Sequence, residues 1–578
     1  MVGKAYNGYS HPIDIDASKI KQDLAAHHRG HPADNSTTLS RSMLRMAVSK
    51  IRPIHVGIIG AGFAGMRCAD MLLQRGMRVT IIEARDRVGG RVAQSNHLGH
   101  LVDLGPNWIH GTEDNPILEL AKQTSTILHS WGERQSIFDR LGKVMPAHEA
   151  TEYAELFWGI VADAFKYSNE HSTEIPASRS LIDFVTDKAR EMFHDDAEAE
   201  QKRQTLLDIA QMWGAFVGGP ANRQSLRFFW LEECIEGENP FVAETYAKIL
   251  AKVQESIRGA EIRLNEEVTS IGSLQAEPPD SGPHDDHLRN VIVTSSPTQL
   301  LNQSEAETIV SAFDEVVVTC PLGWLKGNKS VFIPELEPNL SKAIDAIGYG
   351  TLDKVYITFP SAFWNEPVPD QIVATPETDE RLPNVAAAST ALHQRPDERA
   401  TTEDYPGFTH WLSPHYANSN PDHWDQQGCN LAALPTSCAH PTLLFYIYGP
   451  CGGHIADLVK TTPEAELDDA LYAFFNPYYS RLPSYSASDP ACRPKAVLAT
   501  AWANDRFAGY GSYSNFQIGL EEGDKDIECM RHGMPERHIW FAGEHTAPFV
   551  ALGTSTGAYW SGEAVANRIV KAYGMDDT

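Results

Sequence analysis

The sequence of 578 residues contains no long run of apolar side chains. A helix that spans a bilayer needs about 20 consecutive residues that are mostly apolar, and no stretch of this chain approaches that length. The first residues, MVGKAYNGYSHPIDIDASK, lack the apolar core of a secretory signal. The last residues, GMDDT, do not form a peroxisomal tripeptide. We therefore expect a cytoplasmic protein without a membrane partner.

Cysteine is scarce, and its spacing argues against two further classes of site. The eight cysteines are scattered along the chain, and none forms a CxxC pair. Because CxxC pairs are typical of zinc sites and thiol redox centres, we expect free thiols in a reducing compartment and no metal site.

Positive charge is also scarce. Lys and Arg number 48 against 76 Asp and Glu, which gives a net charge of −28. Proteins that bind nucleic acids need basic surfaces to neutralise phosphates, so we do not expect nucleic acid as a partner. The acidity is compatible with the attraction of a cationic small molecule, and equally with a role in solubility alone.

The chain does contain a glycine-rich turn, which lies between an apolar run and a segment of helical length. The apolar run Val56–Ile59 leads into the sequence GAGFAG, a segment of helical length follows, and a second apolar run occupies Val79–Ile82. A Rossmann-type dinucleotide site needs this order of strand, turn, helix and strand. In such a site Gly60 makes the tight turn, Gly62 lets the backbone approach the pyrophosphate, and Gly65 allows the helix to pack on the strand.

An acid stands where this type of site needs one. Glu83 directly follows the second apolar run and lies 18 residues after Gly65. The acid that binds the ribose hydroxyls is expected about 20 residues after the glycines. The pyrophosphate would sit at the N-terminus of the first helix, where free N–H groups favour negative charge.

The hydrophobic pattern changes several times along the rest of the chain. A length of 578 residues predicts two or more domains. Residues 116–244 carry apolar positions at helical spacing. Alternation predicts a strand at Glu261–Ile271, and further strands are expected at Val291–Thr294 and Glu315–Thr319. The segment 365–440 is loop-rich, and it either rims an active-site mouth or is decoration.

A second junction of strand and helix lies near the C-terminus. The buried-type strand Ile539–Ala542 runs into Gly543 and Glu544. The segment Gly553–Gly562 then supplies small residues at the start of a helix that continues to about Lys571. Small residues at a helix start let backbone amides approach a ligand closely.

Taken together, these blocks resemble the flavin-containing amine oxidase family, which includes polyamine oxidases, monoamine oxidases, L-amino-acid oxidases and flavin histone demethylases. The matches cover roughly half of the chain, in the family's order. They are GAGFAG with EARDRVGGR, DLGPNWIHG with Asn115-Pro116, VVVTCPLGWLK, GYGTLDKVYITF, Trp502 with GSYS, and WFAGEHT with GTSTGAYWSG. The WIHG tetrad and its flanking asparagines look most like the polyamine oxidases.

The resemblance implies an α/β fold in which a discontinuous Rossmann-like FAD-binding domain is interleaved with an α+β substrate-binding domain. Residues 1–49 would form an N-terminal extension. The FAD-binding domain would comprise residues 50–115, 245–325 and 495–578, and the substrate-binding domain residues 116–244 and 326–494.

The implied cofactor is FAD. Beyond the turn glycines and Glu83, the resemblance implies that the cofactor is bound by Arg85, Gly90, Arg91, Asn107, Trp108, Gly543, Glu544, Thr554 and Ser555. Monoamine oxidases carry their flavin on a cysteine just before the first channel aromatic. Ser512 stands at that position here, so the resemblance implies a non-covalent flavin.

Five residues acquire catalytic roles from the resemblance. Lys354 stands where the family has a lysine that holds a water at flavin N5. Trp502 and Tyr513 align with aromatics of the substrate channel, whose ring faces attract a cationic amine. Thr554 takes the second position of the usual aromatic pair. His110 would lie beside flavin and substrate and hydrogen-bond the amine.

The implied activity is oxidation of an amine C–N bond, in a polyamine or acetylated polyamine. Hydride passes to flavin N5, O2 is converted to H2O2, and an aldehyde is released. Candidate carboxylates for remote nitrogens are Glu113, Asp114, Glu232, Glu233, Glu236 and Glu238, although for any single one of these a solvated surface acid is the favoured interpretation. The alternatives are a histone lysine demethylase, an L-amino-acid oxidase and a flavoprotein without turnover. The oligomeric state is left open.

Overall fold

The computed structural model describes Arg45 and residues 52–132, 134–194, 197–273, 289–298, 308–366 and 405–575. Apart from Arg45, the expected N-terminal extension lies outside the described residues, as do residues 367–404 of the loop-rich segment.

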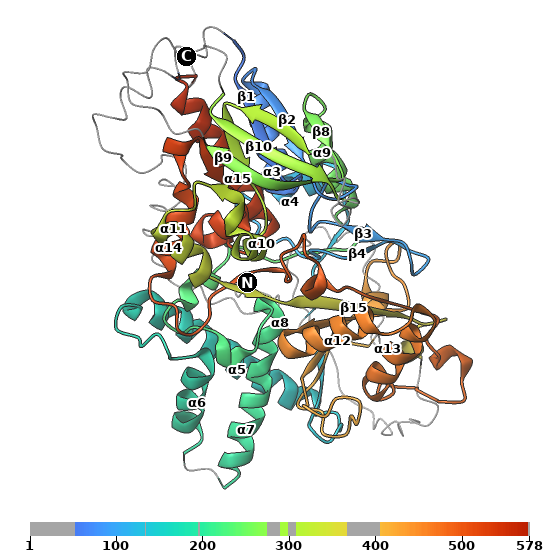
Figure 1. Cartoon of the computed structure of the whole chain (residues 1–578). Helices are drawn as coiled ribbons and strands as arrows, with labels where there is room; N and C mark the ends of the chain where they lie inside the picture. Colours follow the sequence, from blue (N-terminus) through green and yellow to red (C-terminus); the bar gives the residue numbers. More distant parts are fainter. Residues whose placement is uncertain are drawn as a thin grey trace, which may run out of the picture.

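A five-stranded parallel sheet is assembled from four separate stretches of chain (Figure 1). Its strand order is β21-β12-β1-β2-β8. The strands are β1 (His55–Ile59), β2 (Arg78–Ile82), β8 (Glu261–Arg263), β12 (Glu315–Val318) and β21 (Ile539–Phe541). The three strands β1, β12 and β21 are buried at every position, as expected for a parallel sheet with both faces covered. The strand, turn, helix and strand predicted from the glycine motif are confirmed as β1, α3 (Phe63–Gln74) and β2.

The two ends of the described chain meet on this sheet. Helix α15 (Ser555–Ala572) packs against α3. At the contact, a Cβ on Gly562 would collide with the carbonyl oxygen of Ala64. The first and last motif blocks of the sequence therefore form one structural unit, because only a glycine permits this close approach.

A four-stranded sheet lies beside the parallel one, with the order β11-β10-β9-β13. Its strands are β9 (Glu266–Ser273), β10 (Val291–Pro297), β11 (Ile309–Phe313) and β13 (Phe332–Ile333). The single strand expected at Glu261–Ile271 is wrong, because the segment forms β8 and β9 in two different sheets. Asn265 separates them with a φ of 58°, a left-handed conformation that asparagine tolerates better than most residues.

A six-stranded sheet forms the second large unit, in the order β19-β15-β18-β17-β16-β6. Its strands are β6 (Gln135–Phe138), β15 (Leu352–Thr358), β16 (Phe408–Trp411), β17 (Gln426–Asn430), β18 (Thr442–Tyr448) and β19 (Ala496–Ala499). Helices α12 (Gly449–Thr461) and α13 (Glu464–Tyr479) lie against it (Figure 1). One face of the sheet packs on these helices through Val355, Phe445 and Trp411.

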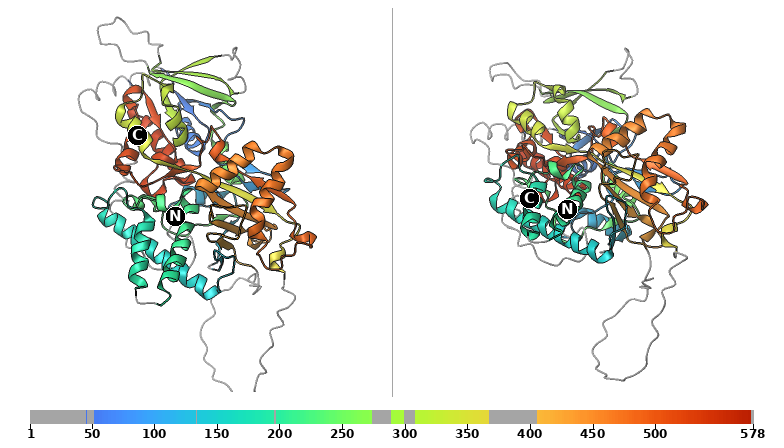
Figure 2. Two further views of the ribbon diagram at one scale, coloured as in Figure 1. Left: turned by 60° about the horizontal axis from the view of Figure 1, so that its bottom comes forward. Right: turned by 90° about the horizontal axis from the view of Figure 1, so that it is seen from below.

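The helical lobe seen in Figure 2 contains α5 (Ala147–His171), α6 (Leu181–Met192) and α7 (Ala199–Ala210). Its core includes Phe165, Trp213 and Phe229. The capping box of Ser180 and Asp183 begins α6. The largely helical character expected for residues 116–244 is confirmed, although the short strands β5 (Leu128–His129), β6 and β7 (Phe241–Val242) interrupt it.

The domain limits remain a proposal, and the packing suggests two adjustments. Helix α11 (Pro338–Ala346) shares a core with β12 and α14 (Gly523–His532), although the expected limits place it in the substrate-binding domain. Strand β19 pairs with β15 in the six-stranded sheet. We propose that the second segment of the substrate-binding domain runs from about residue 348 to about residue 500.

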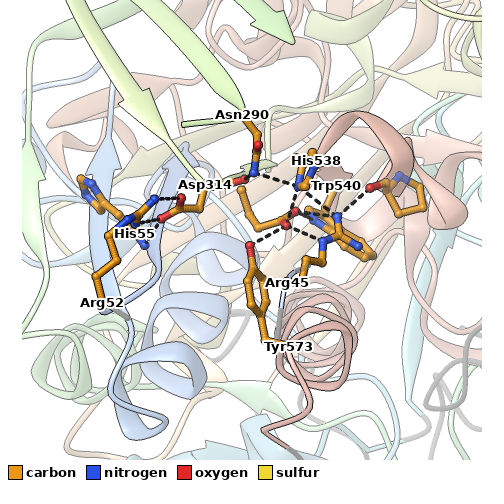
Figure 3. Close-up of polar contacts among 10 residues, drawn as sticks. Arg45, Arg52, His55, Asn290, Asp314, His538, Trp540 and Tyr573 are labelled. Carbon is orange, nitrogen blue, oxygen red and sulfur yellow. Dashed lines mark hydrogen bonds and ion pairs between the residues drawn. The ribbon is translucent and has the colours of Figure 1, made fainter. Parts of the chain in front are cut away.

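Two arginines near the start of the described chain dock on the parallel sheet (Figure 3). Arg45 forms an ion pair of 3.1 Å with Glu315, and Arg52 forms one of 2.5 Å with Asp314. Burial alone would raise the pKa of Glu315, but His538 and Arg45 overcome this and hold the pKa below its usual value. These contacts anchor the N-terminal end of β12. Ligands in open α/β sheets bind at the opposite, carboxyl ends of the strands. Among the described residues no helix is both long and apolar enough to cross a membrane.

Candidate active site

A cavity of about 300 Å³ is lined by residues of the parallel sheet, the six-stranded sheet and the start of α15. Every residue expected to bind FAD or to act in catalysis lines it except Gly65. The shared lining brings together blocks from the beginning, middle and end of the chain. No group of His, Cys, Asp and Glu within the described ranges could hold a metal ion.

The glycine turn has one open position and two crowded ones. Gly60 has a φ of 105°, a conformation that L side chains rarely adopt. A Cβ on Gly65 would collide with the carbonyl oxygen of Gly60, whereas a Cβ on Gly62 would meet no atom within 4 Å. Gly62 therefore leaves room for a ligand, while Gly65 is needed for packing of the helix.

Glu83 closes the same turn from the end of β2. Its two carboxylate oxygens accept hydrogen bonds from the backbone N–H of Ala61, at 2.7 Å, and of Arg85, at 2.9 Å. The carboxylate lines the cavity, where its remaining lone pairs suit ribose hydroxyls. The Arg85 guanidinium pairs with Asp505 at 2.8 Å.

Glu544 is bound by protein donors from two segments. Arg91 pairs with it at 3.1 Å, and the Ser514 hydroxyl donates to it at 2.5 Å. Burial opposes ionisation, but Arg91 and the neighbouring groups hold the pKa of Glu544 below its usual value. Arg91 also donates to the carbonyl oxygen of Ser512 at 2.6 Å. The pair of Arg91 and Glu544 thus fixes the loop before Tyr513 against the segment Gly89–Arg91.

Helix α15 begins at the cavity. The Thr554 hydroxyl accepts a hydrogen bond from the Gly557 N–H at 2.9 Å, and so caps the helix. Ser555 lies 3.1 Å from the hydroxyl of Tyr246. Because a helix N-terminus carries a partial positive charge, this end of the cavity favours a ligand with negative charge.

Lys354 lies on β15 and is buried. Its Nζ donates to the carbonyl oxygens of Gly105 and Asp103, and lies 5.9 Å from the centre of the Tyr446 ring. Burial lowers the pKa of Lys354 to about 8, and burial raises the pKa of Asp103 to about 7. The side chain lines the cavity and does not face solvent.

Trp502 and Tyr513 line the cavity together with Lys354. The Trp502 indole N–H donates to the carbonyl oxygen of Leu104 at 3.1 Å. The Tyr513 hydroxyl donates to the carbonyl oxygen of Phe216 at 2.7 Å, and burial raises the pKa of Tyr513. Both rings are thus held at fixed orientations by main-chain acceptors.

His110 lines the cavity as a neutral imidazole. Burial lowers its pKa to about 3, and its Nδ1 has no hydrogen-bond partner among the described residues. Asn115 places the segment by donating to the carbonyl oxygen of His110 at 3.1 Å, while it caps helix α4 (Pro116–Gln123). Thr556 of α15 donates to the same asparagine at 3.0 Å.

The carboxylates expected for remote nitrogens do not line the cavity. The exposed acids are Glu113, Asp114, Glu236 and Glu238. Glu232 is buried and Glu233 half-buried, and burial raises the pKa of each to about 7. Glu113 and Asp114 directly follow WIHG in the sequence, yet both are exposed. Glu233 accepts a hydrogen bond from the Asn169 side chain of α5 at 2.7 Å, and Glu232 accepts one from the Phe516 N–H at 3.4 Å.

Several lining residues were not predicted as site residues. Three of them, Thr319, Cys320 and Pro321, directly follow β12. They belong to the family-like block VVVTCPLGWLK, so the resemblance of that block could have identified them. Phe408, Gln427 and Tyr446 lie on three strands of the six-stranded sheet. Nothing local in sequence marks these three, because strand pairing alone brings them to the cavity.

The lining fits FAD at several points. Gly62 offers an open approach to backbone, Glu83 an acceptor for hydroxyls, and the start of α15 a positive dipole. The rings of Trp502 and Tyr513 would lie at the other end of such a cofactor, with Lys354.

Comparisons with known proteins agree with this geometry. The family described as flavin-containing amine oxidoreductase matches residues 63–570. Probable polyamine oxidase 4 of Arabidopsis thaliana is 26% identical over 57% of this chain and 63% of its own length. Polyamine oxidase 4 of Oryza sativa subsp. japonica is 26% identical over 91% of both chains. Lysine-specific histone demethylases also match.

Among solved structures, cyclohexylamine oxidase from Brevibacterium oxydans superimposes with a TM-score of 0.60. The alignment covers 91% of this chain and all of that one, at 16% identity. This likeness confirms the expected fold.

Proposed function

Because the chain belongs to the flavin-containing amine oxidoreductase family, and so is an FAD-dependent enzyme, we propose that it oxidises the C–N bond of a polyamine or acetylated polyamine. The observation that carries the proposal is the convergence of Lys354, Trp502 and Tyr513 on the cavity that contains the dinucleotide turn. When bound, FAD supplies the hydride acceptor at flavin N5 and returns the electrons to O2, which leaves as H2O2.

The protein residues supply orientation and control of charge. Trp502 and Tyr513 present ring faces that pack against the neutral reacting amine, with their orientation set by Leu104 and Phe216. The reacting carbon loses hydride only when the adjacent nitrogen carries a free lone pair, so the amine must bind in its neutral form. A neutral His110 suits this requirement, because its pKa of about 3 keeps it uncharged.

Lys354 is the residue that we assign to proton control. Its amino group is anchored by main-chain oxygens, and its pKa of about 8 lets it gain or lose a proton during turnover. An ordered water held by this amine would lie within the cavity. The imine product is then hydrolysed to an aldehyde and an amine.

Two observations bear on the substrate. The polyamine oxidases among the relatives support a polyamine. The acids among the described lining residues are Glu83, Glu266, Glu267 and Glu544; Glu83 closes the dinucleotide turn, Glu266 and Glu267 begin β9 beside it, and Glu544 is paired with Arg91. The strands of the six-stranded sheet contribute only Lys354 as a charged lining residue. A neutral, acetylated remote end therefore suits this wall better than a second ammonium group.

Anaerobic reduction of the purified holoenzyme tests the proposal. Spermine, spermidine, N-acetylspermine, a monoamine and a methyl-lysine peptide are added separately, and the flavin absorbance is followed. Bleaching by a polyamine or its acetylated form, with aldehyde and H2O2 released in air, is the expected result. Bleaching only by the peptide would instead favour a demethylase, and bleaching by none would favour a flavoprotein without turnover.

A further inference from the structure

Four polar side chains form a row across the six-stranded sheet. Strand pairing sets His410 opposite Gln427, Gln427 opposite Tyr446, and Tyr446 opposite Lys354. Residues directly opposite one another on neighbouring strands project from the same face of a sheet. Lys354, Tyr446 and Gln427 line the cavity, so this row forms part of its wall and runs away from the proposed reaction centre.

Gln427 carries an unpaired oxygen within this row. The residue is 8% exposed, and its Oε1 is buried without a hydrogen-bond partner among the described residues. An unpaired buried carboxamide oxygen costs about 1–3 kcal/mol. The neighbouring hydroxyl of Tyr446 does not relieve this cost, because it already donates to Asn107 at 3.1 Å and accepts from the Trp108 indole at 3.0 Å.

We propose that Gln427 is a specificity-determining residue that hydrogen-bonds a neutral amide at the remote end of the substrate. This inference rests on the proposed function. It names the subsite that binds the end of the substrate that is not oxidised. Neighbouring strands lie about 4.8 Å apart, so Gln427 stands about 10 Å from Lys354 along the sheet. The amide would therefore bind two strands away from the lysine.

The surroundings of Gln427 favour an uncharged partner. Phe408 and Tyr446 line the cavity on either side of it, on β16 and β18. The next member of the row, His410, is buried, and burial lowers its pKa to about 3, so it is neutral as well. An ammonium group placed here would lose hydration without gaining a carboxylate, whereas an amide pairs with a carboxamide at little cost.

The test compares three secondary amines that differ only in the remote group. N-butyl-1,3-diaminopropane carries an ammonium there, its derivative acetylated on the primary amine carries the amide, and N-butylpropylamine carries neither. In Gln427→Leu we expect the ratio of kcat/KM for the acetylated diamine to that for N-butylpropylamine to fall about tenfold or more. In Gln427→Glu we expect the ratio of kcat/KM for the free diamine to that for the acetylated diamine to rise about tenfold, because a carboxylate then faces the ammonium.

Gln426→Leu is the matched control. Gln426 lies on the same strand but is absent from the cavity lining, and its amide donates to the carbonyl oxygen of Trp424 at 3.1 Å. It should leave both ratios as in the wild type. An equal fall in the first ratio in Gln426→Leu and Gln427→Leu would overturn the proposal, as would unchanged ratios in both Gln427 variants.

A binding measurement separates this inference from the proposed function. N-butylacetamide has the amide but no amine to oxidise, and its binding to the oxidised holoenzyme is followed by calorimetry. Binding in the wild type and its loss in Gln427→Leu, with the flavin spectrum retained, supports the subsite even if none of the amines is oxidised. Equal binding by both proteins, or by neither, overturns the subsite even if amines are oxidised.

Discussion

The guanidinium of Arg45 lies 3.1 Å from the carboxylate of Glu315, a side chain with no exposed surface (Figure 3). Two further donors, the Trp540 indole at 2.6 Å and the Tyr573 hydroxyl at 3.0 Å, bind the same carboxylate. The residue that precedes the FAD-binding unit is thus bonded into the base of its central sheet.

Loss of this ion pair should weaken the fold. We expect Arg45→Met to lower the free energy of unfolding by about 3 kcal/mol, because a buried carboxylate loses its arginine partner while His538 stays at 2.7 Å. Urea unfolding followed by tryptophan fluorescence measures the change. Arg258→Met is the control, since Arg258 is 78% exposed in its pair with Glu255 and such pairs contribute less than about 1 kcal/mol. Equal stability of the two variants would contradict the assigned role.

Alanine substitutions at Gly62 and Gly65 of the dinucleotide turn should have different effects on FAD binding and on stability. Gly62→Ala should fold like the wild type but bind FAD more weakly, because its Cβ meets no protein atom and instead occupies the ligand's space. Gly65→Ala should lower the stability of the apoprotein, because its Cβ collides with Gly60. Thermal unfolding of apoprotein and titration with FAD separate the two effects. Similar loss of apoprotein stability in both variants would show that the open position was misassigned.

The pH dependence of turnover should report Lys354. Its amine is protonated below pH 8 and neutral above it, so we expect kcat to rise with pH through about 8. Lys354→Met should keep FAD, turn over at least about tenfold more slowly, and lose this rise. His110→Gln should keep the rise, because the pKa of His110 lies near 3. A wild-type profile that stays flat between pH 6 and 10 would exclude the assignment.

The same shift has a consequence for stability. Since the folded protein releases the Lys354 proton near pH 8 and an unfolded lysine near 10.5, the unfolded state binds more protons between these values. The free energy of unfolding of the wild type, relative to Lys354→Met, should therefore increase as the pH rises through this range. Denaturant unfolding at pH 7.5 and pH 10 measures the difference, and a decrease would be the wrong sign.

The flavin should be removable without breaking a covalent bond. The Ser512 hydroxyl accepts from the Leu352 N–H at 2.8 Å and lies 3.1 Å from the carbonyl oxygen of Gly350, so it has a structural role in the loop. We expect acid precipitation to release FAD into the supernatant, measured by its absorbance. Flavin retained in the protein pellet would show a covalent link at another residue.

The sequence predicted those parts of the site that depend on contiguous residues. The turn from Gly60 to Gly65 and the helix start within Gly553–Gly562 are local, and the structure has them where the motifs indicate. The placement of Lys354 in the cavity came from the resemblance of its whole block. By contrast, Gln427 reaches the wall only through its pairing with Tyr446. Periodicity does not specify which strands become neighbours.

One expected strand was wrong, and one set of candidate carboxylates does not line the cavity, because both depend on tertiary context. The strand at Glu261–Ile271 breaks at Asn265, whose left-handed conformation leaves no mark in the alternating pattern. The acids near WIHG suited a cationic substrate in composition, yet Glu113 is exposed. A side chain's neighbours along the chain do not determine which surface it faces.

The pairing of Ala64 with Gly562 also sets the order of events during synthesis. Gly65 and Ser555 are separated by 490 residues, which a ribosome translating about 5–20 residues per second adds in about 25–100 s. Throughout that interval the nascent β1–α3–β2 unit lacks the helix that covers it, and its apolar flank stays open to other chains. Capture of the cofactor at a finished pocket must therefore wait until translation is almost complete.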